Sequence, residues 1–149
     1  MQFRAFLAAS AVALGLASPG LLHAQNLPPA VSGLDLQDVK VRAKPRAEYG
    51  RNVYGTLPSG AKVEVELDGQ DLIKEIETTR RKQFSVADVR SLIPAAVLNN
   101  SAFPADATLE KIEFERDGRI ELEGRLASGK KFDAEFRADG QLLDFDTDD

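Results

Sequence analysis

The chain has 149 residues, with 19 Lys and Arg against 24 Asp and Glu, one His, one Met, and no Cys or Trp. The only imidazole, His23, and the only sulfur, in Met1, both lie in a leader that we expect to be removed. Their loss excludes Ser-His-Asp and Cys-His catalysis, thiol redox chemistry and the usual zinc, haem and iron–sulfur sites. Oxygen ligands remain, and these suit a hard cation.

Residues 1–24 have the pattern of a secretory signal peptide. Arg4 supplies a positive charge, an apolar run follows, and Ala24 is a small residue before the predicted cut. The run is about 18 residues long and contains a Pro-Gly pair, so it is at or below the length needed to span a bilayer. We therefore expect cleavage after Ala24, a periplasmic or secreted product, and no membrane insertion after cleavage. Without cysteine no disulfide can hold the fold, so the core must do so.

Negative charge is concentrated at the end of the chain. Residues 132–149 contain seven acids and one arginine, whereas residues 25–131 contain equal numbers of the two signs. Such a balance argues against a nucleic-acid partner, because phosphates attract clustered Lys and Arg. The triplet Arg80-Arg81-Lys82 is the one basic cluster in the sequence, and we interpret it as a solvated linker or helix end.

Residues 25–83 indicate a truncated helix followed by a rough meander of strands. Val63, Val65 and Leu67 alternate with polar residues, which is typical of a strand with one buried face. The first hairpin has a long loop over residues 43–49. Residues 72–76 fit either a last strand or the start of a helix.

A helix signal begins at Ser85. Ser85 and Asp88 form a capping box, and an apolar stripe follows as far as Val97. Pro94 interrupts this stripe, so we expect a kink or a restart near residues 92–94. Because both surfaces need a partner, this helix is expected to cover the apolar face of the sheet that follows.

Residues 112–146 show period-2 alternation through four segments. Gly-containing turns at residues 117–118, 128–129 and 139–140 separate the segments. In the last segment we expect Leu143 and Phe145 on the apolar face and Asp144 and Asp146 on the polar face. The pattern predicts an antiparallel meander that is buried on one side and solvated on the other.

The two parts of the chain resemble each other. Residues 27–31 correspond to 93–97, Gly50-Arg51 to Gly118-Arg119, and residues 63–67 to 132–136, with offsets between 66 and 73. Chance spacing of turns is the alternative explanation. We favour a duplication, with copies at 25–83 and 84–149 in one compact α+β domain, each copy being a helix plus a β-meander.

The second copy resembles the PepSY-like family of periplasmic, β-lactamase-inhibitor-like proteins, and the first copy matches it less well. The resemblance implies a small secreted α+β module that binds or inhibits and has no enzymatic activity, and it transfers no catalytic residue. The residues that carry it are Ile93–Val97, Phe103-Pro104, Ile112–Glu115, Asp117-Gly118, Ser128–Lys130, Phe132–Phe136 and Asp139–Leu143.

The first functional hypothesis is a non-enzymatic module that binds a protein or peptide, and that could inhibit a peptidase or another hydrolase. Contact would be made by sheet-edge pairing or by polar side chains. Tyr49 and Tyr54, in the divergent first hairpin, are the candidate contacts, since tyrosine is favoured at interfaces. The competing interpretation is that both tyrosines pack at the edge of the sheet. We expect no cofactor.

Two further hypotheses use carboxylates. Asp144, Asp146, Asp148 and Asp149 could hold Ca²⁺, but they lack the glycine and distal glutamate of an EF-hand loop, and a frayed acidic tail is the competing interpretation. Paired carboxylates such as Glu113/Glu115 or Glu121/Glu123 could in principle act as a glycosidase pair. Because they occupy the solvated side of strands, we expect no enzyme and no metal ligand among them.

Overall fold

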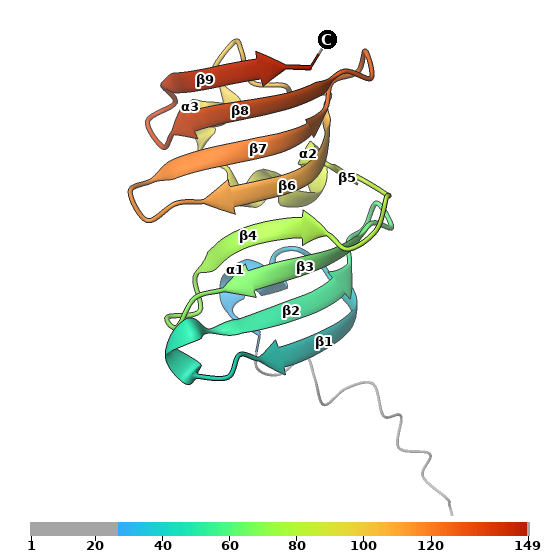
Figure 1. The fold of residues 1–149 in the computed structure, drawn as a ribbon, viewed down its shortest axis with the longest axis vertical. Coiled ribbons are helices and arrows are strands. Elements are labelled where there is room, and N and C mark those ends of the chain that lie inside the picture. The colour runs from blue at the N-terminus through green and yellow to red at the C-terminus, as the bar shows by residue number, and fades with distance from the viewer. Residues whose placement is uncertain (1–26, 149) are drawn as a thin grey trace, which may run out of the picture.

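The computed structural model describes residues 27–148, so the predicted leader and its cleavage site lie outside the described residues. These residues form a nine-stranded antiparallel sheet with short helices on one face (Figure 1). The strand order is β1-β2-β3-β4-β6-β7-β8-β9, and the short β5 pairs with β6. Within residues 27–148 no helix is long and apolar enough to cross a membrane.

Each half of the sheet follows a short helical segment. The first half contains α1 (Pro29–Ser32), β1 (Gln37–Ala43), the 3₁₀ helix η2 (Ala47–Tyr49), β2 (Arg51–Thr56), β3 (Lys62–Leu67) and β4 (Ile73–Thr78). The second half contains β5 (Phe84–Ser85), α2 (Val86–Val89), the 3₁₀ helix η3 (Arg90–Leu92), α3 (Ala95–Leu98), β6 (Thr108–Phe114), β7 (Arg119–Arg125), β8 (Lys131–Arg137) and β9 (Leu142–Thr147).

One hydrophobic core runs behind both halves. Val31 from α1, Val89 from α2 and Val97 from α3 are fully buried together with the inward side chains of the strands. A single apolar row crosses the middle of the sheet in register. Its buried members are Val53, Val65, Ile76, Ile112, Leu122 and Ala134.

The two halves meet at a short junction between β4 and β6. Only Glu75 with Glu113, Ile76 with Ile112, and Glu77 with Lys111 are paired there. Ile76 and Ile112 are both 0% exposed. The sheet is therefore continuous from β1 to β9, although only three pairs of residues join its two halves.

The helical region breaks where the proline is. Ser85 Oγ accepts a hydrogen bond from the Ala87 N–H at 3.1 Å, and the Asp88 carboxylate accepts one from the Ser85 N–H at 3.0 Å, which is the expected capping box. The chain leaves the helical path after η3 and restarts at Pro94, the residue before α3. The predicted restart is confirmed, because proline is tolerated at a helix start and not within one.

The side of the sheet predicted for one side chain, that of Leu143, is wrong. We expected Leu143 to share the apolar face with Phe145, but Leu143 is 37% exposed, and Leu142 and Phe145 pack against the core. The register explains the difference: Glu135 pairs with Asp144 but Phe136 pairs with Leu142, so Leu143 is an extra, bulged residue. A bulge reverses the parity that strict alternation predicts. Residues 72–76, which the sequence left open, belong mostly to strand β4.

Candidate functional site

The side of the sheet that the helices leave uncovered is a surface of charged side chains, which we call the charged face. Its two central rows are polarised, because β1 contributes two cations to them whereas their charged residues from β3 to β9 are acids apart from Lys111; on β7 and β8 the rows are flanked by Arg119, Arg125, Lys131 and Arg137. Two rows cross it, with one residue from each of eight strands in register. The first row is Arg42, Asn52, Glu66, Glu75, Glu113, Glu121, Glu135 and Asp144. The second row is Lys40, Tyr54, Glu64, Glu77, Lys111, Glu123, Asp133 and Asp146.

Lys111 is the cation at the centre of the acidic part. Its ammonium lies 3.4 Å from the Glu113 carboxylate and 3.1 Å from that of Glu121, and it also pairs with Glu123. Burial on its own would lower the pKa of Lys111, but hydrogen bonds to Glu123 and Glu121 outweigh burial and hold the pKa well above its ordinary value. Sequence reasoning missed this cluster; its signal was a lone lysine on the polar side of strands otherwise rich in glutamate.

The described residues bring three carboxylates to one point, and these are not the tail aspartates. Oxygens of Glu121, Glu123 and Asp133 lie within 4.8 Å of one another. The Lys111 ammonium already pairs with two of the three. Burial, followed by the nearby charges of Glu121 and Glu123, raises the pKa of Asp133. The Lys111 ammonium thus supplies the positive charge that a metal ion would supply in a metal site.

The predicted calcium ligands are not members of that group, although Asp146 lies directly opposite Asp133 and lines one hollow with Glu123, Asp133 and Asp148. Asp144 and Asp146 belong to the ordered strand β9, opposite Glu135 and Asp133, so this part of the tail is not frayed. Asp148 follows the strand, and Asp149 lies outside the described residues. No metal-ligand group among residues 27–148 contains a tail aspartate. Calcium binding by the tail stays a prediction from the sequence.

Two neighbouring glutamates on the charged face respond to opposite influences. Hydrogen bonds from Lys44 and Lys74, at 2.7 and 2.9 Å, lower the pKa of Glu66. Burial, with the charge of Glu113 next, raises the pKa of Glu75, which pairs with Glu66 across β3 and β4. The same face therefore contains one carboxylate whose ionisation stabilises the fold and one whose ionisation opposes it.

These opposite pKa shifts predict that substituting the two glutamates changes the stability of the fold in opposite directions. Glu75→Gln should raise the free energy of unfolding at neutral pH by roughly 0.5 kcal/mol, and Glu66→Gln should lower it by roughly 1 kcal/mol. The stability from protonated Glu75 is present below its ordinary pKa of 4.5 and is lost as pH rises through the raised pKa, so the gain in Glu75→Gln disappears in acid. The contribution of ionised Glu66 is present above 4.5 and is lost as pH falls through the lowered pKa. Urea unfolding at neutral pH and near pH ~3 measures both, and changes of the same sign would contradict the assignment.

The two candidate tyrosines occupy different places. Tyr54 is half-buried on the charged face between Lys40 and Glu64, with the Arg42 guanidinium 5.5 Å from its ring centre. Tyr49 is 52% exposed in η2, with Arg46 5.8 Å from its ring. Tyr49 lies in the first hairpin loop, and Tyr54 lies within the sheet beside β1. Each ring therefore has a guanidinium group near it.

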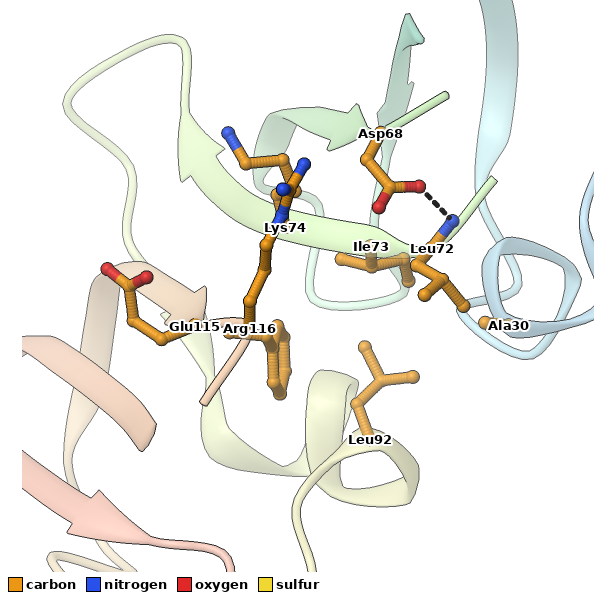
Figure 2. Close-up of a pocket in the computed structure, with 9 residues that line it drawn as sticks. Ala30, Asp68, Leu72, Ile73, Lys74, Leu92, Glu115 and Arg116 are labelled. Carbon is orange, nitrogen blue, oxygen red and sulfur yellow. Dashed lines mark hydrogen bonds between the residues drawn. The ribbon is translucent and has the colours of Figure 1, made fainter. Parts of the chain in front are cut away.

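An open cleft lies where β4 and β6 diverge beyond their junction. Its volume is about 350 Å³, and its apolar lining comes from Leu72, Ile73, Leu92 and Phe114. Figure 2 shows these leucine and isoleucine side chains around the hollow, with charged groups at the rim. The Asp68 carboxylate there accepts a hydrogen bond from the Leu72 N–H at 3.0 Å. The cleft could take one apolar side chain of a partner.

Three of the carboxylates named in the enzyme hypothesis surround one ammonium group. Glu121 and Glu123 share Lys111, and Glu113 pairs with the same ammonium. No polar or charged side chain among the described residues is fully buried. Arg80, Arg81 and Lys82 are exposed between β4 and β5, so the predicted solvated linker is confirmed.

No protein-family model and no curated protein matches the sequence. Solved structures that are similar to this chain include the following three. A protein of unknown function from Bacteroides vulgatus, described as a candidate periplasmic protein, has 22% identity and a TM-score of 0.49 over 80% of this chain and 91% of its own. A DUF2874 family protein from Bacteroides uniformis has 15% identity and a TM-score of 0.34, over 80% and 88%. A BLIP-like protein from Bacteroides fragilis has 19% identity and a TM-score of 0.33, over 83% and 89%. These likenesses are too distant to carry an argument about function.

Proposed function

We propose that this protein is a non-enzymatic binding module of the periplasm or of the secreted fraction, and that it binds a protein or peptide through the charged face. The observation that carries the proposal is an eight-strand face that the helices leave uncovered, along which two rows of residues run from cations on β1 to acids on β9. Export is supported by the pattern of residues 1–24.

The charges on the face define the chemistry of the partner. From β4 to β9 its two rows contain acids with Lys111 as the one cation. A partner with a basic patch would gain association rate and selectivity there. Tyr54, beside the basic strand β1, would supply an aromatic contact at the other end of the face, and Tyr49 would extend it along the hairpin loop.

We also propose that the halves are tandem copies of one PepSY-like unit. Support comes from the strand registers. In β3–β4, Glu66 pairs with Glu75 and Leu67 with Ile73; in β8–β9, Glu135 pairs with Asp144 and Phe136 with Leu142, each 69 residues later. The bulged residues, Lys74 and Leu143, correspond as well. A shared bulge is a more specific likeness than a shared turn, because bulges are features that related strands keep.

Partner capture tests the binding face. Exported protein serves as bait in three forms: the native chain, a face variant with Asp133→Asn and Asp146→Asn, and a control with Asp106→Asn and Asp139→Asn in turns. Both variants lose the same charge, and Asp133→Asn relieves repulsion, so the fold should persist. We expect the native chain and the control to retain a partner whose affinity falls at least about tenfold with the face variant.

Equal retention by all three forms would exclude the charged face as the binding surface. Inhibition of a peptidase or another hydrolase is a narrower form of the same proposal. Assays of periplasmic peptidases and β-lactamases with the native chain and the face variant examine it, with loss of inhibition in the face variant as the expected result.

A further inference from the structure

We infer that this protein associates head to tail with further copies of itself, by antiparallel pairing of β9 of one copy with β1 of the next. This inference is independent of the proposed binding function. It concerns the edges of the sheet, although the charges it uses, Lys40, Arg42, Asp144 and Asp146, also form the ends of the two rows of the charged face. The partner is a second copy of this chain.

The sheet ends in two open edges. Within the described residues β1 pairs only with β2, and β9 pairs only with β8. The two strands lie at opposite ends of the molecule (Figure 1). Each presents backbone N–H and C=O groups that another strand can satisfy, which makes an open edge a template for pairing.

The edges carry opposite charge. On the solvent side β1 presents Lys40 and Arg42, whereas β9 presents Asp144 and Asp146. Pairing of two identical edges would place like charges side by side, which opposes it. Pairing of unlike edges would place each aspartate beside a cation. The charges therefore select β9 against β1 and reject β1 against β1 or β9 against β9.

The junction inside the chain supplies the register. There β4 and β6 pair Glu75 with Glu113, Ile76 with Ile112, and Glu77 with Lys111. By the correspondence of the halves, β9 is the counterpart of β4 and β1 that of β6. The same register between two copies places Asp144 beside Arg42, Phe145 beside Val41, and Asp146 beside Lys40. One opposite-charge pair at the internal junction becomes two at the junction between copies.

Exposure of an apolar side chain at the edge agrees with this register. Val41 is 39% exposed, whereas its counterpart in the internal junction, Ile112, is 0% exposed against Ile76. Phe145 would cover Val41 from the second copy; its ring is held by stacking on Phe132, with ring centres 5.9 Å apart. Burying such side chains is the favourable step that pairing adds to backbone hydrogen bonds.

The contact between copies would be short. Asp38, with φ of 53°, and the register shift between Gln37 and Lys40 disturb the first part of β1, which leaves Lys40 to Ala43 regular. A disturbed edge limits unselective pairing. A contact this small gives weak, concentration-dependent association, and because its two sides differ it builds open chains or rings and no two-fold dimer.

Charge exchange tests the inference. Sedimentation of the exported protein should show a mean mass that grows with protein concentration at low salt and falls with added salt. Two double variants exchange the charge of one edge each: Lys40→Asp with Arg42→Asp, and Asp144→Lys with Asp146→Lys. Each variant alone should remain monomeric, because both of its edges then have the same charge. An equal mixture of the two variants should associate again, because each edge then meets an edge of opposite charge. Circular dichroism checks that both variants fold. A native chain that is monomeric up to about 1 mM, or a mixture that stays monomeric, would overturn the inference.

Cysteine pairs test the register. The chain has no cysteine, and β2, β3, β4, β6, β7 and β8 lie between its two edge strands, so no disulfide can join them within one copy. Under mild oxidation with glutathione disulfide, Lys40→Cys with Asp146→Cys should give disulfide-linked oligomers. The matched control, Lys40→Cys with Asp144→Cys, is two residues out of register and should give far fewer, because the diagonal separation of about 7–8 Å exceeds the reach of a disulfide. Equal yields would contradict the register.

Discussion

Ile112→Ala should lower the free energy of unfolding by about 3 kcal/mol. Ile112 is 0% exposed in β6, and it meets Ile76 in the short junction that joins the two halves. Truncation removes three buried carbons and leaves a cavity behind a junction of three residue pairs, so little else there can compensate. Urea unfolding at low protein concentration measures the loss, and the two halves should still unfold together.

Val41→Ala is the matched control, because Val41 occupies the corresponding position in β1 but is 39% exposed. We expect it to cost less than about 1 kcal/mol, since much of that side chain already contacts water. If the two variants lost the same free energy of unfolding, the junction would be no more tightly packed than the edge, which would contradict the burial of Ile112.

Lys111→Met should lower the free energy of unfolding by about 2 kcal/mol at neutral pH and low salt. The substitution keeps most of the apolar stem but removes the ammonium that pairs with Glu113, Glu121 and Glu123. Three carboxylates would then repel one another across β6 and β7. Urea unfolding at low salt measures the loss.

The pH range follows from the direction of the shift. The pKa of Lys111 is raised, so its contribution is present below the ordinary lysine pKa of 10.5 and is lost as pH rises through the raised value. In acid the glutamates become neutral and the cost of Lys111→Met should shrink. Added salt should also reduce it by screening the carboxylates.

Lys74→Met is the control for Lys111→Met, because Lys74 is 44% exposed and pairs with Glu66 at 2.9 Å. An exposed pair of this kind contributes about 1 kcal/mol or less. If the two lysine substitutions cost the same, and salt changes neither, then Lys111 does not organise the acidic part of the charged face.

The strands and their faces could be predicted because they depend on neighbouring residues. Phe132, Ala134 and Phe136 alternate with charged residues, and the strand they form buries those three side chains. The capping box at Ser85 and the break at Pro94 are equally local, since both depend on groups within one turn of helix. The turns could be predicted because glycine readily adopts the positive φ angles that such turns require, as it does at Gly118 and Gly129.

The candidate site was harder to predict. Tyr54 and the aspartates of β9 were named from the sequence, but their neighbours across the sheet were not. Lys111 and Glu121 are ten residues apart along the chain, and only the pairing of β6 with β7 brings their side chains together. The cleft beside Leu72 and Phe114 exists because β4 and β6 pair briefly and then diverge.

The sequence by itself determined the strands, their apolar and polar sides, the helix start at Ser85 and the surplus of acid near the end of the chain. Only the tertiary structure decided that both halves share one sheet, that Leu143 is a bulge exposed to solvent, and that Lys111 lies among three glutamates. The physical reason is that alternation and capping act over a few residues. Register is decided instead by hydrogen bonds and packing between segments far apart in the chain, whose total free energy selects one pairing.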